Sequence, residues 1–218
     1  MKKPSDDLDV LPTPATTISI QPPNFQQATV RLVGTSPYVS NKFSARARSA
    51  LMETQMAGSQ SKKGKKREPK NFEERWRESA HLSTDGWYGM PASSIRNAMI
   101  SACRTVGFRM TLAKLSLFVD HDGLDVDDAT PLLKIIGEPK RRDRNVRLAT
   151  GVIDIMTAAV WDQWEIEAVL RWDADQFSAG DVINLLSRAG QQVGVGAGRP
   201  DSKMSNGMGW GTFRVATS

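Results

Sequence analysis

Lysine and arginine side chains, the groups that pair with phosphates, are concentrated in two short segments of the 218-residue sequence. Residues 42–70 hold nine of them against two acids, and residues 140–147 hold five against one acid. Because the whole chain has a net charge of +5, the rest of it carries a net charge of −6. This separation predicts a surface that binds a polyanion, with a pair of solvated loops as the alternative interpretation. The predicted binding residues of the two segments are Lys42, Arg46, Arg48, Lys62, Lys63, Lys65, Lys66, Arg67, Arg141, Arg142, Arg144 and Arg147.

Two aromatic residues stand where they could stack on bases. Trp87 and Tyr88 follow the first basic segment and precede a predicted helix. Aromatic rings bind single-stranded nucleic acid by stacking, because every base has a flat face. Local packing is the alternative for both. Four later tryptophans are expected in the core and the sheet instead: Trp161, Trp164, Trp172 and Trp210.

Groups that could perform catalysis or hold a metal are few. The sequence has two histidines and one cysteine, and His81 has no neighbour in sequence that would make it a general base. Cys103 falls inside a predicted helix, which does not suit a nucleophile. The acidic turn at residues 120–128 lacks the distal glutamate and following helix of a calcium-binding loop, so a solvated turn is expected. We therefore expect no catalytic residue, no metal and no cofactor.

A glycine-rich segment, residues 189–211, contains seven glycines. In a phosphate-binding loop the glycines stand between a strand and a helix, whereas here they follow a predicted helix. The dinucleotide-binding fingerprint fails for the same reason. The segment is therefore predicted to connect the last helix to the last strand, where its glycines would let a ligand approach the backbone closely.

Hydrophobic periodicity predicts an α+β fold. Strands are expected at residues 28–34, 115–120, 132–137, 151–156, 164–172 and 209–217, and helices at 90–108 and 177–190. The core order strand–helix–strand–strand–helix–strand predicts a ferredoxin-like, RNA-recognition-motif-like arrangement, with helices on one face of an antiparallel sheet.

The domain organisation follows from composition. Residues 1–26 hold five prolines and little apolar periodicity, which predicts a flexible arm. Residues 27–218 are expected to form one domain with long basic insertions at about 35–86 and 120–150, the first including a short helix near residues 71–80. No apolar run reaches the length of a membrane span, and a single cysteine suits a reducing compartment. These features predict a cytoplasmic protein without a membrane partner.

Two stretches, read together, resemble the RAMP superfamily, the RNA-recognition-motif-like subunits of CRISPR effector complexes. "YGMPASSIRNAMISACR" is similar to the segment that introduces a helix bearing a basic residue, and "LLSRAGQQVGVGAGRP" before "GMGWGTFRV" is similar to the family's C-terminal half. The resemblance covers residues 29–33 and 86–215 and suits the repeated backbone subunit best. It implies that copies of the protein stack into a filament along single-stranded RNA. Beyond the palm positions Lys42, Arg46 and Arg48, the binding residues that it implies are Ser93, Ser94, Arg96, Gly194, Gly196 and Arg199.

Two departures from the family pattern shape the expected function. The chain is shorter than most backbone subunits, which implies reduced finger or thumb elaborations. Cleaving members use an aspartate in the loop after the first strand, and here Asp85, a poor match, is the one aspartate between Gly34 and Pro91. We therefore expect a non-catalytic, cytoplasmic protein of a prokaryotic cell or of a virus-infected prokaryotic host. Its expected partners are single-stranded nucleic acid (RNA favoured over DNA), copies of itself and other CRISPR effector subunits.

Two alternatives stay open. One is a metal-dependent endoribonuclease of the same family that uses Asp85 or the acidic turn. The other is a virus-borne protein that mimics a backbone subunit and interferes with CRISPR complexes. A stand-alone or mobile-element-borne member of the family fits the residues as well as a member encoded at a CRISPR locus.

Overall fold

The structure is a computed structural model that describes residues 20–40, 42–58, 69–147, 151, 153–202 and 208–216. Most of the predicted N-terminal arm therefore lies outside the described residues. The same holds for five predicted binding residues: Lys62, Lys63, Lys65, Lys66 and Arg67. For Arg147 the structure describes the backbone but not the side chain.

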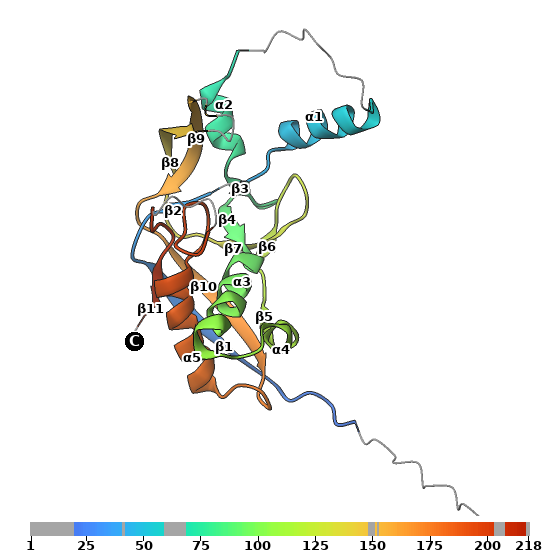
Figure 1. The fold of residues 1–218 in the computed structure, drawn as a ribbon, viewed down its shortest axis with the longest axis vertical. Coiled ribbons are helices and arrows are strands. Elements are labelled where there is room, and N and C mark those ends of the chain that lie inside the picture. The colour runs from blue at the N-terminus through green and yellow to red at the C-terminus, as the bar shows by residue number, and fades with distance from the viewer. Residues whose placement is uncertain are drawn as a thin grey trace, which may run out of the picture.

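A four-stranded antiparallel sheet forms the centre of the molecule (Figure 1). Its strands are β1 (Phe25–Gly34), β5 (Leu117–Val119), β10 (Glu165–Asp173) and β11 (Phe213–Val215), arranged in the order β11-β1-β10-β5. In β10, alternate residues are buried, as a half-buried strand requires. The two long helices of this unit, α3 (Ala92–Ala102) and α5 (Ala179–Arg188), pack over one face of the sheet.

Each of these two helices has a local reason to begin or end where it does. Ser178 begins α5 with a reciprocal capping box, in which Ser178 Oγ accepts from the Asp181 N–H and the Asp181 carboxylate accepts from the Ser178 N–H. The 3₁₀ turn η1 (Cys103–Val106) continues α3 and stops at Gly107, whose φ is 72°. A π-helical turn, η2 (Ala189–Val193), continues α5 into the glycine-rich segment.

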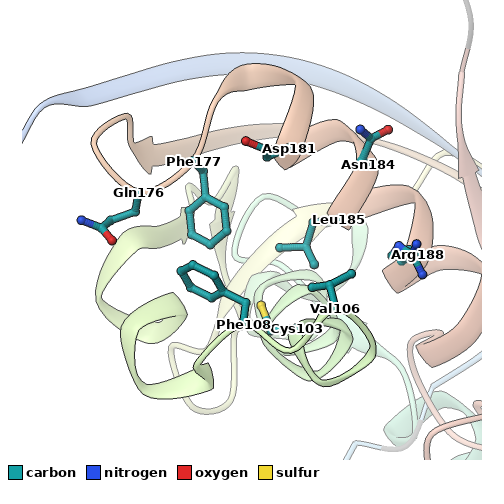
Figure 2. A pocket seen from close by; sticks show the side chains of 9 residues that line it. All are labelled: Cys103, Val106, Phe108, Gln176, Phe177, Asp181, Asn184, Leu185 and Arg188. Carbon is teal, nitrogen blue, oxygen red and sulfur yellow. The ribbon is translucent and has the colours of Figure 1, made fainter.

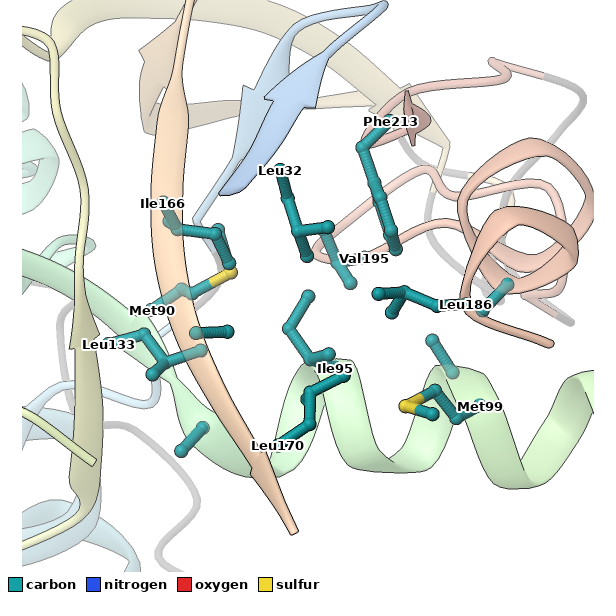
Figure 3. Close-up of a cluster of buried hydrophobic side chains, with 14 of the residues drawn as sticks. Leu32, Met90, Ile95, Met99, Leu133, Ile166, Leu170, Leu186, Val195 and Phe213 are labelled. Carbon is teal, nitrogen blue, oxygen red and sulfur yellow. The ribbon is translucent and has the colours of Figure 1, made fainter. Parts of the chain in front are cut away.

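The apolar core lies between the sheet and the two helices (Figure 3). Leu32 and Ile166 come from the sheet, Ile95 from α3 and Leu186 from α5, and all four side chains are fully buried. The four large rings Trp161, Trp164, Tyr38 and Phe213 extend this core, since Tyr38 contacts both tryptophans at centroid distances of 5.5 and 5.8 Å. Burying such rings supplies much of the driving force for folding. The prediction that Trp161, Trp164 and Trp172 are core residues is confirmed.

The two predicted insertions fold together beyond one end of the main sheet. In one small sheet, β2 (Tyr38–Val39) from the first insertion pairs with β9 (Ile153–Trp161), which pairs with β8 (Lys140–Arg147). In another, β3 (His81–Leu82) and β4 (Tyr88–Pro91) join β7 (Pro131–Lys134) and β6 (Gly123–Leu124). The helices α1 (Ala45–Met56) and α2 (Phe72–Glu78) complete this region, and α1 projects from the body (Figure 1).

Several details correct the sequence-based expectations, although the α+β class is confirmed. The basic run at 140–147, for which solvated loop was one interpretation, is strand β8, because it pairs along its whole length with apolar β9. The strand expected at 115–120 begins two residues later, since Leu115 and Ser116 end the unexpected helix α4 (Met110–Ser116). The strands expected at 132–137 and 151–156 belong to the small sheets, not to the main one. None of the helices in the described part of the chain has the length and apolar character that crossing a membrane requires.

Close packing at Gly190 provides a test of the joint between η2 and β11. A Cβ atom at Gly190 would lie 2.2 Å from the carbonyl oxygen of Phe213. We expect Gly190→Ala to lower the free energy of unfolding by about 1–3 kcal/mol, because β11 or η2 must move. Gly180→Ala is the matched control, since the nearest atom to its Cβ is 3.7 Å away. The control should be neutral or stabilising by up to about 1 kcal/mol in urea denaturation, and equal losses in both variants would contradict the prediction.

Candidate functional site

Two sequence segments that were assigned to binding separately meet in one groove. Ser94, Asn97, Ala98 and Ser101 of α3 form one wall, and Val193, Gly194, Val195, Gly196 and Arg199 of the glycine-rich segment form the other. We call this hollow, of about 200 Å³, the α3–turn groove. Its walls are mainly polar, and it contains four of the predicted binding residues: Ser94, Gly194, Gly196 and Arg199.

Glycine is required in the wall formed by the turn. Gly194 and Gly196 have φ values of 71° and 74°, which side-chain-bearing residues rarely adopt. A Cβ atom at Gly196 would lie 2.6 Å from the carbonyl oxygen of Val39, so the turn could not pack against β2. The glycines thus serve the fold first, and they leave backbone groups next to the groove.

Hydrogen-bond donors are available along both walls. Arg199 donates through Nη1 to the carbonyl oxygen of Gly196 at 3.2 Å, which places its guanidinium group against the turn. Helix α3 has Pro91 as its N-cap and no side-chain cap hydrogen bond, so its first N–H groups have no partner from a capping side chain. Ser93 is exposed on this first turn, beside Ser94. Backbone and guanidinium donors in such an arrangement suit an anionic or polar ligand.

Arg96 lies outside the groove, although it belongs to the same predicted motif. Its Nε donates to the carbonyl oxygen of Leu117 at 2.8 Å, and its Nη2 donates to that of Lys114. Its guanidinium carbon lies 5.5 Å from the ring centre of Phe118. These contacts tie α3 to the junction of α4 and β5, so the structure gives Arg96 an anchoring position.

Several of the described basic residues of the two insertions are paired with acids. Arg48 contacts Asp128 at 2.7 Å, and hydrogen bonds, first from Thr130 and then from Arg48, lower the pKa of Asp128 to about 2. Arg142 contacts Asp162 at 2.7 Å. Exposed pairs of this kind contribute about 0–1 kcal/mol and are weakened by salt, so they can exchange partners. Two further predicted binding residues pair in the same way, Arg46 with Glu74 and Glu78, and Arg141 with Asp143 and Glu73.

Arg144 is held differently from its neighbours in β8. Its guanidinium carbon lies 5.0 Å from the ring centre of Trp210, and Nη2 contacts the sulfur of Met156 at 3.3 Å. Burial lowers the pKa of this guanidinium, and Nε is buried without a hydrogen-bond partner in the described residues. The side chain therefore packs against the glycine-rich segment instead of extending into solvent.

Trp87 and Tyr88 are neighbours in sequence but have different surroundings. The Tyr88 ring packs edge-on against Trp161 of the core, with centroids 6.1 Å apart. The Trp87 ring lies against Gly89 and Gly123, and it lines a hollow of about 400 Å³ near β10. Trp87 is thus the better placed of the two for contact with a ligand.

A buried ionic cluster was missed in the sequence. Asp125 accepts hydrogen bonds from Lys42 Nζ at 2.8 Å and from His81 Nδ1 at 2.7 Å, and its side chain is fully buried. Lys42 also contacts Asp127 at 2.6 Å, and its own side chain is 3% exposed. The interpretation of the acidic turn as wholly solvated is therefore wrong for Asp125, because burial there requires paired charges. Lys42 presents no surface to a polyanion.

The electrostatics of this cluster favour charged Lys42, charged Asp125 and neutral His81. Burial acts to lower the pKa of Lys42, but its hydrogen bonds to Asp125 and Asp127 outweigh burial and raise it. Burial acts to raise the pKa of Asp125, and the donors around it lower it overall. For His81 burial dominates, so its pKa is lowered despite the nearby carboxylate. The cluster joins segments far apart in sequence, and no local pattern indicates it.

Two other features bear on the predicted chemistry. An apolar hollow of about 340 Å³ lies between η1 and α5, with Cys103, Phe108, Phe177 and Leu185 among its walls (Figure 2). Burial raises the pKa of the Cys103 thiol, which does not suit a nucleophile. Asp85 is exposed in the turn between β3 and β4. In the part of the chain that the structure describes, no three histidine, cysteine, aspartate or glutamate residues are grouped to hold a metal.

Comparison with models of known protein families and with the sequences of curated proteins gives no match.

The buried histidine leads to a testable pH dependence. Since the pKa of His81 is lower in the folded state, the unfolded chain binds more protons once the pH falls below about 6.5. Stability should therefore decline between pH 7 and pH 5, before the Asp125 contribution is lost below about pH 4. His81→Asn keeps a donor to Asp125 but cannot titrate, so thermal unfolding of this variant should depend less on pH between 7 and 5. His121→Asn, at the exposed second histidine, should retain the wild-type slope; a wild-type slope in His81→Asn would contradict the assignment.

Proposed function

We propose that the protein is a non-catalytic, single-stranded nucleic-acid-binding protein of the RAMP backbone type, with RNA as the favoured ligand. The observation that carries the proposal is the α3–turn groove, where Ser94, Gly194, Gly196 and Arg199 lie together. The resemblance implied roles for both segments without any information on their distance in space. Because the two segments line one groove in the folded chain, a single ligand can contact both.

The topology of the main sheet supports the same proposal. We propose that β1, α3, β5, β10, α5 and β11 form a ferredoxin-like unit, since they follow one another in that order in the chain. The sheet order β11-β1-β10-β5, with both helices on one face, supports this arrangement. The additional strands and the helices α1 and α2 then belong to insertions after β1 and after β5, whereas α4 lies between α3 and β5.

The groove favours the sugar–phosphate backbone as its ligand. Its volume of about 200 Å³ is too small for a stacked series of bases, but its walls offer hydroxyl, amide and guanidinium donors. Contacts to the backbone carry little sequence information and depend strongly on salt. On the insertions, Arg46, Arg48, Arg141 and Arg142 would exchange carboxylates for phosphates along the same strand.

Arg199 provides the test of the groove. Arg199→Gln should weaken binding to oligo(U) and reduce the slope of log affinity against log salt by about 0.7, the value for one phosphate contact on a single strand. Arg199→Lys keeps the charge and should keep the slope. Arg109→Gln makes the same charge change at an exposed residue before α4 and should have no effect. Fluorescence anisotropy across a salt series measures all four proteins, and an unaltered slope in Arg199→Gln would remove the groove from the interface.

We also propose that copies of the protein assemble along the strand, and α1 supports this. None of its residues is buried, and Met52 and Met56 are 55% and 85% exposed. A 12-residue helix without a packed face is marginal in water, so a neighbouring molecule would stabilise it.

The double variant Met52→Glu, Met56→Glu tests this assembly. It should bind a short oligo(U) as the wild type does, yet form smaller complexes on long poly(U), because charge replaces apolar contact area. Leu115→Glu, at a residue of α4 that is 73% exposed, is the matched control. Sedimentation velocity measures complex size, and complexes of wild-type size from the double variant would exclude α1 from the contact.

A further inference from the structure

The face of the main sheet opposite α3 and α5 carries aromatic and guanidinium side chains. Leu170 and Trp172 of β10 are buried toward the helices, so Val169 and Arg171 lie on the opposite face. Arg171 pairs directly across the sheet with Phe118 of β5. Phe25, at the start of β1, lies on the same face as Arg171 by the register of β1 and β10.

These side chains form a compact, partly exposed cluster. The rings of Phe25 and Phe118 meet edge to face, with centroids 5.6 Å apart. The guanidinium carbon of Arg171 lies 5.5 Å from the centre of the Phe25 ring and 5.3 Å from that of Phe118. Phe25 is 43% exposed, and no carboxylate among the described residues forms an ion pair with Arg171. In the described part of the chain, an exposed aromatic group and a guanidinium without an ion pair thus lie together on the sheet face that the helices leave uncovered.

Trp87 extends this cluster along the sheet. It lines a hollow of about 400 Å³ together with Val169 and Glu167, which lie on the open face of β10, and with Asp122, Lys134 and Ile136. The Trp87 ring is backed by Gly123, where a Cβ atom would lie 2.8 Å from it. Val169 is two residues from Arg171 on the same face, so the hollow adjoins the phenylalanine cluster. We call Phe25, Phe118, Arg171, Val169 and Trp87 the open-face strip.

We propose that the open-face strip is a stacking site for unpaired bases of a single-stranded nucleic acid. The inference rests on the proposed function but concerns a different surface, because the α3–turn groove lies between α3 and the glycine-rich segment. Aromatic rings and the planar guanidinium group of arginine are the side chains on which unpaired bases stack. Stacking requires flat, partly exposed surfaces at successive positions, which Phe25, Arg171 and Trp87 provide.

The charges near the strip favour bases over phosphates as the group in contact. Glu167, Asp122 and Lys134 line the same hollow as Trp87, so carboxylates outnumber the single ammonium group there, and carboxylates repel a phosphate. A carboxylate accepts hydrogen bonds from the amino groups of cytosine and adenine, however, so these two acids suit base edges. The strip and the groove would therefore contact different parts of the strand, the strip its bases and the groove its backbone.

An abasic strand separates the two contacts experimentally. Affinities are measured for 12-residue oligo(C) strands of RNA and of DNA, and for an abasic strand of the same length and charge. Phe25→Leu and Arg171→Lys, which keep apolar bulk and charge but remove a flat surface, should weaken binding of the base-bearing strands by at least about fivefold. Both variants should bind the abasic strand like the wild type. Phe25→Tyr keeps the ring and is the matched control, with an affinity equal to that of the wild type.

The outcomes distinguish the strip from the groove. Equal wild-type affinity for base-bearing and abasic strands, together with unchanged binding by Phe25→Leu, would overturn the strip while leaving backbone binding in place. A loss in Phe25→Leu with no effect of Arg199→Gln would support the strip and reject the groove. Failure of every strand to bind would reject both. Far-ultraviolet circular dichroism of each variant confirms that a lost affinity is not a lost fold.

Discussion

Close contacts between backbone groups at the glycine-rich segment join the main sheet to the first insertion. The Val195 N–H donates to the carbonyl oxygen of Gly211 at 2.9 Å, and a Cβ atom at Gly211 would lie 1.8 Å from Val195 O. The same segment reaches the first insertion, since the Gly211 N–H donates to Pro37 O at 2.8 Å and the Ala197 N–H to Val39 O at 2.9 Å. A side chain at Gly211 would prevent this approach. The glycine-rich segment therefore has a structural role in addition to lining the α3–turn groove.

The insertions depend on these contacts and on the ionic cluster. The contacts of the glycine-rich segment fix the position of β2. Strand β2 pairs with β9, and β9 pairs along its other edge with the basic strand β8. Ser79, after α2, adds a further contact by accepting the Ala159 N–H at 2.7 Å. Asp125 then joins the two insertions through Lys42 and His81. Because a buried carboxylate without its partners is costly, these two connections fix how α2, β8 and the acidic turn are arranged.

Ion pairing reduces the positive charge that the two basic segments can offer to a polyanion. In the sequence, residues 42–70 and 140–147 contrast with an acidic remainder, yet in the described part of the structure acids of that remainder lie against the arginines, as Asp162 does against Arg142. A phosphate would have to replace such carboxylates. The exchange is possible at exposed pairs because each contributes little, but it is not possible at buried Lys42. At the groove and the open-face strip a ligand would not compete with carboxylates for arginine, since neither Arg199 nor Arg171 forms an ion pair within the described residues.

Features that depend on neighbouring residues could be predicted from the sequence. The alternation of apolar residues in 164–172 predicted a strand that the structure contains. The capping residues Ser178 and Asp181 and the apolar spacing in α3 predicted the two helices α5 and α3. These predictions succeeded because such signals act within a few residues. Features that depend on contacts between distant segments could be seen only in the folded chain. Tertiary structure placed Asp125 beside His81 across 44 positions, paired β8 with β9, brought Ser94 to Gly196, and left Phe25 and Arg171 on an open face. The physical reason is that burial and ion pairing are set by which segments the core brings together, which local periodicity does not specify.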